Sequence, residues 1–184
     1  MTRFIDLRST TQVRLARWVR GGVIAGVLAL LWAAPAVAAQ PTRLVFYPPS
    51  HADPAGTACA FDVNFEPRRG WDVQTDFSNG SEVVNAHVSV LVTNAETGAS
   101  FVHNATFHGI DRFDAATGID HGTTDGQVLM QFYPGDMGPF GVVESPGALL
   151  RFVGTSWYTW DANANAFTQF SYRGTVTDVC ALIS

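Results

Sequence analysis

The sequence predicts an all-β fold, and three of its features support this prediction. Apolar and polar residues alternate along most of the chain from residue 59 onward, which places apolar side chains on one face of each strand. No stretch of residues 40–184 keeps the spacing of an amphipathic helix over ten residues. Glycine, asparagine and aspartate mark turns between the alternating stretches. We therefore expect an antiparallel sheet with one apolar and one hydrated face.

We expect eight or nine strands. The alternation is clearest in residues 82–93, where every second position from Val84 to Val92 is valine or alanine. The strands are expected near residues 43–47, 58–66, 70–77, 82–93, 99–110, 126–133, 148–160 and 166–181, with a further short strand at 119–122.

Short turns are predicted between neighbouring strands. Asn79-Gly80 is a strong hairpin signal, because both residues tolerate the positive φ of a type I′ turn. Residues 94–98, 114–118 and 161–165 each begin with Asn or Asp and end with a residue that accepts the left-handed conformation, as in a type I turn followed by a bulge. Such hairpins join sequential strands, so we expect an up-and-down order.

The first 39 residues have the pattern of a secretory signal peptide. Five arginines precede an apolar run of 14 residues, Gly21–Ala34, and small residues follow before Gln40. This run is shorter than the ~20 residues that span a bilayer as a helix. We expect cleavage after residue 39 and a single mature domain, residues 40–184, outside the cell or in the cell envelope. An uncleaved N-terminal anchor is the alternative.

The mature chain is acidic and keeps both cysteines. Removing residues 1–39 takes away five of the 11 arginines and one of the 16 acidic residues, which moves the formal charge from −5 to −9. This charge disfavours nucleic acid and anionic membranes as partners. Because an exported protein folds in an oxidising compartment, we predict a disulfide between Cys59 and Cys180. Two buried free thiols are the alternative.

The predicted disulfide bears on how the sheet covers its apolar face. A sheet of about eight strands has to close or to fold over itself. A Cys59–Cys180 bond would join the first long strand to the last, and these strands are neighbours in a closed barrel. We therefore predict a single antiparallel up-and-down β-barrel, with a two-sheet β-sandwich as the alternative.

The residues with catalytic or metal-binding chemistry form no motif that we can assign. The chain has no Gly-x-Ser-x-Gly and no His-Glu-x-x-His, and both cysteines are assigned to the disulfide. His103 and His108 are an odd number of residues apart, so a regular strand directs them to opposite faces and away from a shared metal. We predict no catalytic residue, no metal and no cofactor.

Residues 133–147 are the one long connection that we predict between strands. Long loops in compact domains tend to be lids or binding loops, and this one carries apolar residues among glycines. We predict a ligand site with this loop at the mouth of the barrel; the alternative is that the loop only plugs one end. The predicted lining consists of Trp71, Phe101, Met137, Phe140 and Trp157.

The segment Trp157-Tyr158-Thr159-Trp160 raises the possibility of a sugar-binding surface, because exposed aromatic rings stack on sugars. Alternation directs Tyr158 and Trp160 to one face and Trp157 to the other. At least one of these faces is expected to belong to the core.

Four motifs are spread over the mature chain. They are the ending Gly174–Leu182 with its Thr-Asp-Val-Cys-Ala-Leu run, the stretch Cys59–Val63, the Pro-Gly-Asp loop Pro134–Asp136 and the Pro-Gly-Ala-Leu-Leu stretch Pro146–Leu150. Together they resemble motifs of uncharacterised secreted proteins of actinobacteria. The resemblance covers most of the mature chain, and it implies export and paired cysteines but no known activity.

We expect a secreted, non-enzymatic domain that binds a small apolar ligand or a surface glycan. One alternative is a secreted hydrolase that uses acids and histidines of residues 103–125, such as Asp111, Asp114 and Asp120. The other is a structural or adhesive protein of the cell envelope, which would carry an exposed apolar patch.

Overall fold

The computed structural model describes residues 40–184, and these residues form an all-β fold, as the sequence predicts. The signal-peptide prediction concerns residues 1–39, which lie outside the described residues. The strands and one short helix follow one another in this order: β1 (Thr42–Phe46), β2 (His51–Asp53), β3 (Val63–Asp76), β4 (Ser81–Asn94), β5 (Ser100–Asp114), β6 (Ile119–Phe132), β7 (Met137–Gly138), β8 (Gly141–Val142), β9 (Ala148–Asp161), β10 (Ala166–Asp178) and α1 (Val179–Leu182).

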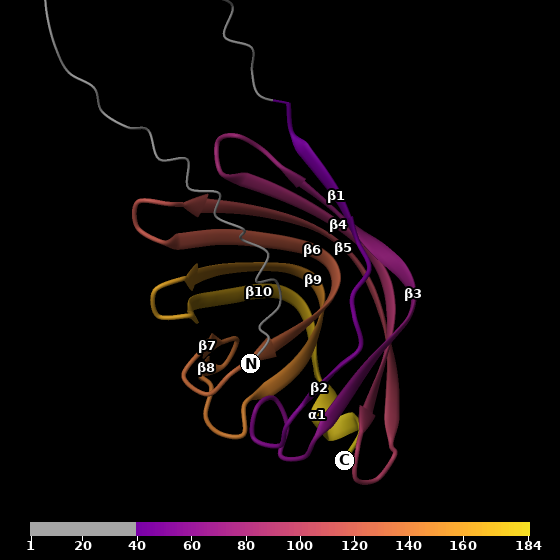
Figure 1. The fold of residues 1–184 in the computed structure, drawn as a ribbon. Coiled ribbons are helices and arrows are strands. Elements are labelled where there is room, and N and C mark those ends of the chain that lie inside the picture. The colour runs from indigo at the N-terminus through magenta and orange to yellow at the C-terminus, as the bar shows by residue number, and fades with distance from the viewer. Residues whose placement is uncertain (1–39) are drawn as a thin grey trace, which may run out of the picture. The chain divides into compact units, whose positions relative to one another are not determined.

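Eight strands form one antiparallel sheet in the order β1-β3-β4-β5-β6-β9-β10, in which β2 also pairs with β3. β7 and β8 form a separate two-stranded sheet. The spatial order follows the sequence order, which confirms the predicted up-and-down arrangement. The large sheet is curved but open, because β1 and β10 are its two edges and do not pair with each other (Figure 1). The described strands therefore do not close into the barrel that we predicted, and the sandwich alternative is compatible with them.

Two pairs of predicted strands are single strands in the structure. β3 continues through the predicted break at residues 67–69, where its pairing with β4 shifts between Pro67 and Arg69. β6 continues through the predicted break at residues 123–125 and through Gly126, which stays paired with β5 and β9. In both places the residues that indicated a turn form a bulge or a bend within a strand. The predicted strand ends at residues 58–62 and 179–181 are instead a loop and the helix α1.

The last residues of the three longer hairpin loops have the backbone conformation that the sequence predicts. Gly98 and Gly118 have a φ of +75° and Asn165 has a φ of +54°, which is the left-handed conformation predicted for the three longer loops. The Asn or Asp that begins each loop accepts backbone N–H groups within it. Asn79-Gly80 also forms a hairpin turn, but only its glycine has a positive φ, +81°, so the predicted type I′ geometry is wrong.

Three glycines aligned across β6, β9 and β10 produce a bend in the sheet. Gly126 pairs with Gly154, which pairs with Gly174, and their φ angles are +124°, +132° and +135°. At each position a Cβ atom would lie 2.1–2.3 Å from a backbone carbonyl oxygen of a neighbouring strand. Only glycine fits such a row. Figure 1 shows the three strands curving together.

Aromatic rings fill the inner side of this bend, which we call the concave face of the sheet. The cluster, here named the bend core, centres on Val128, Phe132, Leu150 and Phe152. The ring of Phe170 lies 5.0 Å from that of Phe132 and 5.1 Å from that of Phe152. Because Phe170 lies on the other side of the glycine row, the bend brings two ends of one sheet face into contact.

β5 and β6 separate at one end of the sheet. Their pairing ends at Thr106 and Gln127, although β5 continues along β4 to Ser100 and β6 continues along β9 to Phe132. The space between them holds a second cluster, which we name the wedge core. Its buried members are Ala58, Cys59, Val63, Phe65, Val92, Leu149, Val179 and Ile183.

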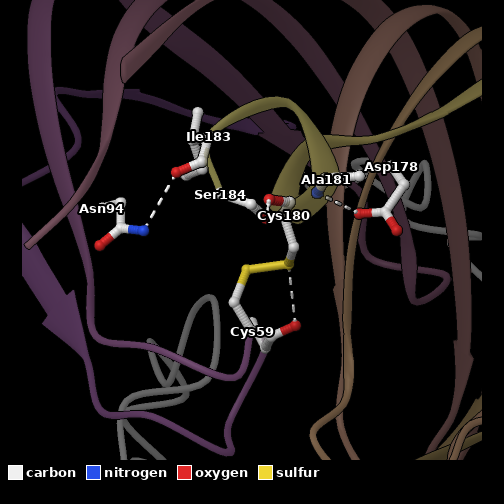
Figure 2. Close-up of a disulfide and its surroundings, with 8 residues drawn as sticks. Cys59, Asn94, Asp178, Cys180, Ala181, Ile183 and Ser184 are labelled. Atoms are coloured by element: carbon white, nitrogen blue, oxygen red, sulfur yellow. Dashed lines mark hydrogen bonds between the residues drawn. A yellow bond between two sulfur atoms is a disulfide. The ribbon is translucent and has the colours of Figure 1, made fainter. Parts of the chain in front are cut away.

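The disulfide and α1 close the wedge core (Figure 2). Cys59, in the loop before β3, is bonded to Cys180 in α1 with their Cα atoms 5.6 Å apart, which confirms the predicted pair. α1 contacts both β5 and β9, and the side-chain Nδ2 of Asn94 donates to the carbonyl of Ile183 at 3.0 Å. The bond thus joins a loop to a helix, so it does not require the first and last strands to be paired.

Candidate functional site

The long loop of residues 133–147 is attached to the concave side of the sheet. Its hairpin, β7–β8, contacts β10. Asp136 is only 2% exposed; its Oδ2 accepts the N–H of Tyr133 at 2.7 Å, and its Oδ1 accepts the N–H of Phe167 at 3.0 Å. One carboxylate therefore closes the loop and fastens it to β10, because a buried charge needs such hydrogen bonds.

A groove of about 420 Å³ lies between this hairpin and the strands β9 and β10. Leu150 and Val176 line it on the strands, and Phe140 and Val142 line it on the hairpin, where they are 78% and 63% exposed. The lining also includes Asp178, whose carboxylate caps the start of α1. The volume falls in the range of roughly 300–1,000 Å³ that is typical of small-molecule sites. We name it the hairpin groove.

The structure does not bring the five predicted lining residues together. Met137 and Phe140 belong to the hairpin, as the loop prediction expected. Phe101 packs against the wedge core, where the guanidinium of an arginine lies 5.6 Å from its ring centre. Trp71 in β3 and Trp157 in β9 lie on the opposite, convex face of the sheet and are 40% and 43% exposed.

Two of the three acids named for a hydrolase lie on the concave face. Asp111 and Asp120 come from the neighbouring strands β5 and β6, and the hydroxyl of Tyr158 in β9 donates to Asp111 Oδ1 at 2.5 Å. Gly122 makes this contact possible, because a Cβ there would lie 2.0 Å from the tyrosine ring. Asp114 instead begins an exposed turn at the end of β5.

The surroundings of Asp111 favour its protonated form. Burial raises the pKa of Asp111 to about 6; the hydrogen bond from Tyr158 opposes this shift and the charge of Asp120 adds to it. Burial and the same carboxylate raise the pKa of Tyr158 far above its usual value, so the phenol remains a donor. The pairing register directs His108 and His121 to the convex face, away from these acids.

His103 in β5 is fully buried and lies close enough to Arg151 to be affected by its charge. It is 1% exposed, and burial, followed by the charge of Arg151, lowers the pKa of its imidazole to about 4. Residues 40–184 contain no group of three or more His, Cys, Asp or Glu side chains arranged to hold a metal ion. His103 is therefore a neutral core residue at pH 7.

Three residues of the site were missed by the sequence analysis. Asp136 follows Pro-Gly in a loop, and a carboxylate in such a turn is a usual acceptor of backbone N–H groups, so this anchor was open to prediction. Leu150 and Val176 gave no signal, because they line the groove only where the hairpin of a different chain segment lies beside them.

The part of the chain that the structure describes has no helix with the length and hydropathy of a membrane span. No protein-family model, no curated protein and no solved structure matches the chain. Its function is accordingly inferred from its own residues.

Proposed function

We propose that the protein is a secreted, non-enzymatic binding protein that holds a small apolar ligand in the hairpin groove. The observation that carries the proposal is the exposure of Phe140 and Val142 beside the apolar side chains of Leu150 and Val176. Exposed apolar surface of this kind is stabilised when a ligand removes it from water. Small size and apolar character of the ligand follow from the volume and the lining of the groove.

Contacts within the protein hold the hairpin in place beside the groove. The carboxylate of Asp136 fastens the hairpin to β10, and the ring of Phe140 packs edge-on at 6.4 Å from that of Tyr172. A groove that exists before binding loses little conformational entropy on binding. Export is supported by the disulfide, which persists in oxidising compartments, and by the pattern of residues 1–39.

Titration with N-phenyl-1-naphthylamine, an uncharged fluorophore, tests the proposal. We expect saturable binding, and we expect Phe140→Ser to weaken it about 10-fold or more, because burying a phenyl ring contributes about 1.5–3 kcal/mol. Val102→Ser is the matched control, since Val102 is 50% exposed on β5 but does not line the groove. Equal affinities of the two variants, or no saturable binding, would contradict the proposal.

Hydrolysis is a second candidate, and the contact between Tyr158 and Asp111 favours it. A carboxyl with a raised pKa beside a second carboxylate is an arrangement used for acid–base chemistry. If the protein hydrolyses nitrophenyl esters or glycosides, Asp111→Asn and Asp120→Asn should each remove the activity. Neither substitution should change naphthylamine binding, so the two functions are distinguishable.

A further inference from the structure

The convex face of β6, β9 and β10 carries a second groove, of about 410 Å³, around Trp157. The pairing register places Trp157 on the middle strand, directly between Thr123 of β6 and Ser171 of β10. All three residues line the groove, and the indole is 43% exposed. A large aromatic ring is thus presented to solvent with a hydroxyl group on each side.

Two rows of polar side chains flank this central row. Each row crosses the same three strands and lies two residues away from Trp157 along β9. One row consists of His121, Thr159 and Gln169, and the other consists of Asp125, Thr155 and Arg173. Thr155 Oγ1 donates to Asp125 Oδ1 at 2.8 Å, and Thr159 Oγ1 lies 3.2 Å from His121 Nδ1. These contacts hold the two threonines and their partners in position next to the indole.

The spacing and chemistry of the rows fit a sugar ring. Residues two apart on a strand are separated by about 6.7 Å, so both polar rows lie close to a ring centred over Trp157. The row of His121, Thr159 and Gln169 lines the groove itself. The apolar face of a pyranose covers an indole ring, while amide, imidazole, hydroxyl and carboxylate groups bond its hydroxyls. One carboxylate and one guanidinium, from Asp125 and Arg173, balance each other, and the acidic mature chain repels anionic ligands.

We propose that this face is a binding site for a neutral saccharide, with one sugar ring stacked on Trp157 and its hydroxyls bonded by the flanking rows, His121 and Gln169 foremost. The site lies on the convex face, whereas the hairpin groove lies on the concave side, so the two are independent. The pairing register directs the side chains of Tyr158 and Trp160, the other two rings of the aromatic segment, to the concave face, so neither ring stacks on the sugar.

Trp71 provides a matched control for Trp157. It is exposed to a similar extent, 40%, on the convex face of the same sheet. The rings of Trp71 and His87 pack in an edge-to-face arrangement, with their centres 5.8 Å apart. It does not line the groove around Trp157. An effect of replacing Trp157 but not Trp71 therefore reports the site and not the general loss of an exposed indole.

Affinity electrophoresis in native gels that contain dextran, laminarin, yeast mannan or arabinogalactan tests the proposal. We expect at least one of these polysaccharides to retard the protein. We expect Trp157→Ala to abolish the retardation and Gln169→Ala to weaken the affinity about 10-fold, while Trp71→Ala and Phe140→Ser retain it. Trp157→Phe, which keeps an aromatic ring, should retain part of the affinity, which excludes misfolding as the cause of the loss.

The proposal is overturned if none of the four polysaccharides retards the protein, or if Trp157→Ala and Trp71→Ala behave alike. If Phe140→Ser still binds the polysaccharide while its affinity for the naphthylamine is weakened, this site is separate from the hairpin groove.

Discussion

The wedge core and the bend core lie in the same sheet, but different structural features stabilise them. The wedge core is mainly aliphatic and fills the space where β5 and β6 separate, and a disulfide and a short helix close it. The bend core is aromatic and fills the inner side of a bend that three aligned glycines allow. An open sheet can thus cover its apolar face in two ways. A loop and a helix can pack against it, or the sheet can bend so that two parts of the same face pack together.

The two regions also differ in what they leave for binding. The convex side of β6 and β9 at the wedge core is covered by the strands opposite, and Phe101 and His103 are enclosed there. The bend core leaves the convex face of the same strands exposed around Trp157, and it supports the hairpin groove beside Leu150. Both proposed sites therefore lie beside the bend core, and no buried residue of the wedge core lines either of them.

The largest expected effect concerns the wedge core alone. Replacing both Cys59 and Cys180 by serine should lower the free energy of unfolding by up to about 4–5 kcal/mol, because the bond closes a loop of 121 residues. Denaturant titration of the variant and of the oxidised protein measures the difference. The reduced native sequence is the control and should match the variant. Equal stabilities of the oxidised protein and the variant would show that α1 holds the wedge core without the bond.

The next effect concerns the bend core. Gly154→Ala places a Cβ 2.2 Å from the carbonyl oxygen of Arg173 in a φ of +132°, so we expect a loss of about 3 kcal/mol or more, with weakened near-ultraviolet circular dichroism from the aromatic rings. Gly98→Ala is the control, because Gly98 has a positive φ but no atom within 4 Å, and it should cost only about 1 kcal/mol. Similar losses for both would mean that the glycine row does not shape the sheet.

The third expected effect is a loss of folding stability at low pH that comes from the buried His103. The pKa of His103 is lowered from 6.5 to about 4, so as the pH falls below 6.5 the unfolded chain binds a proton that the folded chain does not. Folding stability should drop by about 3 kcal/mol between pH 6.5 and pH 4 from this residue. His103→Leu should remove that part of the pH dependence. Unchanged pH dependence in His103→Leu would contradict the burial of a neutral imidazole.

The smallest effect is the pH dependence of folding stability that comes from Asp111 on the concave face. Its sign is opposite to that from His103, because stability falls as the pH rises. Because the pKa of Asp111 is raised to about 6, its contribution to stability is complete below pH 3.8 and is lost as the pH rises through 6. Asp111→Asn should therefore gain about 2 kcal/mol relative to the native sequence between pH 4 and pH 7, since partial solvent access reduces the full shift. Asp114, whose pKa is lowered by hydrogen bonds in its turn, should show the reverse sign on replacement by asparagine. Thermal unfolding at a series of pH values measures both.

Much of the fold could be predicted because alternation and turn chemistry are local. The order of the strands and the left-handed residues that end three hairpin loops follow from short stretches of sequence. The Cys59–Cys180 pair could be predicted because residues 40–184 contain only these two cysteines. The separation of β5 from β6 could not be predicted, because alternation is the same in a paired and an unpaired strand. The barrel prediction failed because Cys59 and Cys180 lie in a loop and in α1, so their bond does not pair the edge strands β1 and β10.

The sites were harder to predict than the fold. Alternation assigned Trp157 to the face opposite Tyr158 and Trp160, as the register shows. It could not show that Phe101 would be enclosed while Trp157 stays exposed, because burial depends on which strands lie opposite. Gly126, Gly154 and Gly174 are far apart in the sequence, so their alignment appears only in three dimensions.

The short helix α1 affects the order in which the wedge core can form. Val179 and Ile183 pack against buried side chains of residues 58–65 and of Val92 and Leu149. Until α1 docks, those apolar side chains stay in contact with water, which is unfavourable. Completion of the wedge core therefore depends on a segment that is distant in sequence from most of the residues it covers.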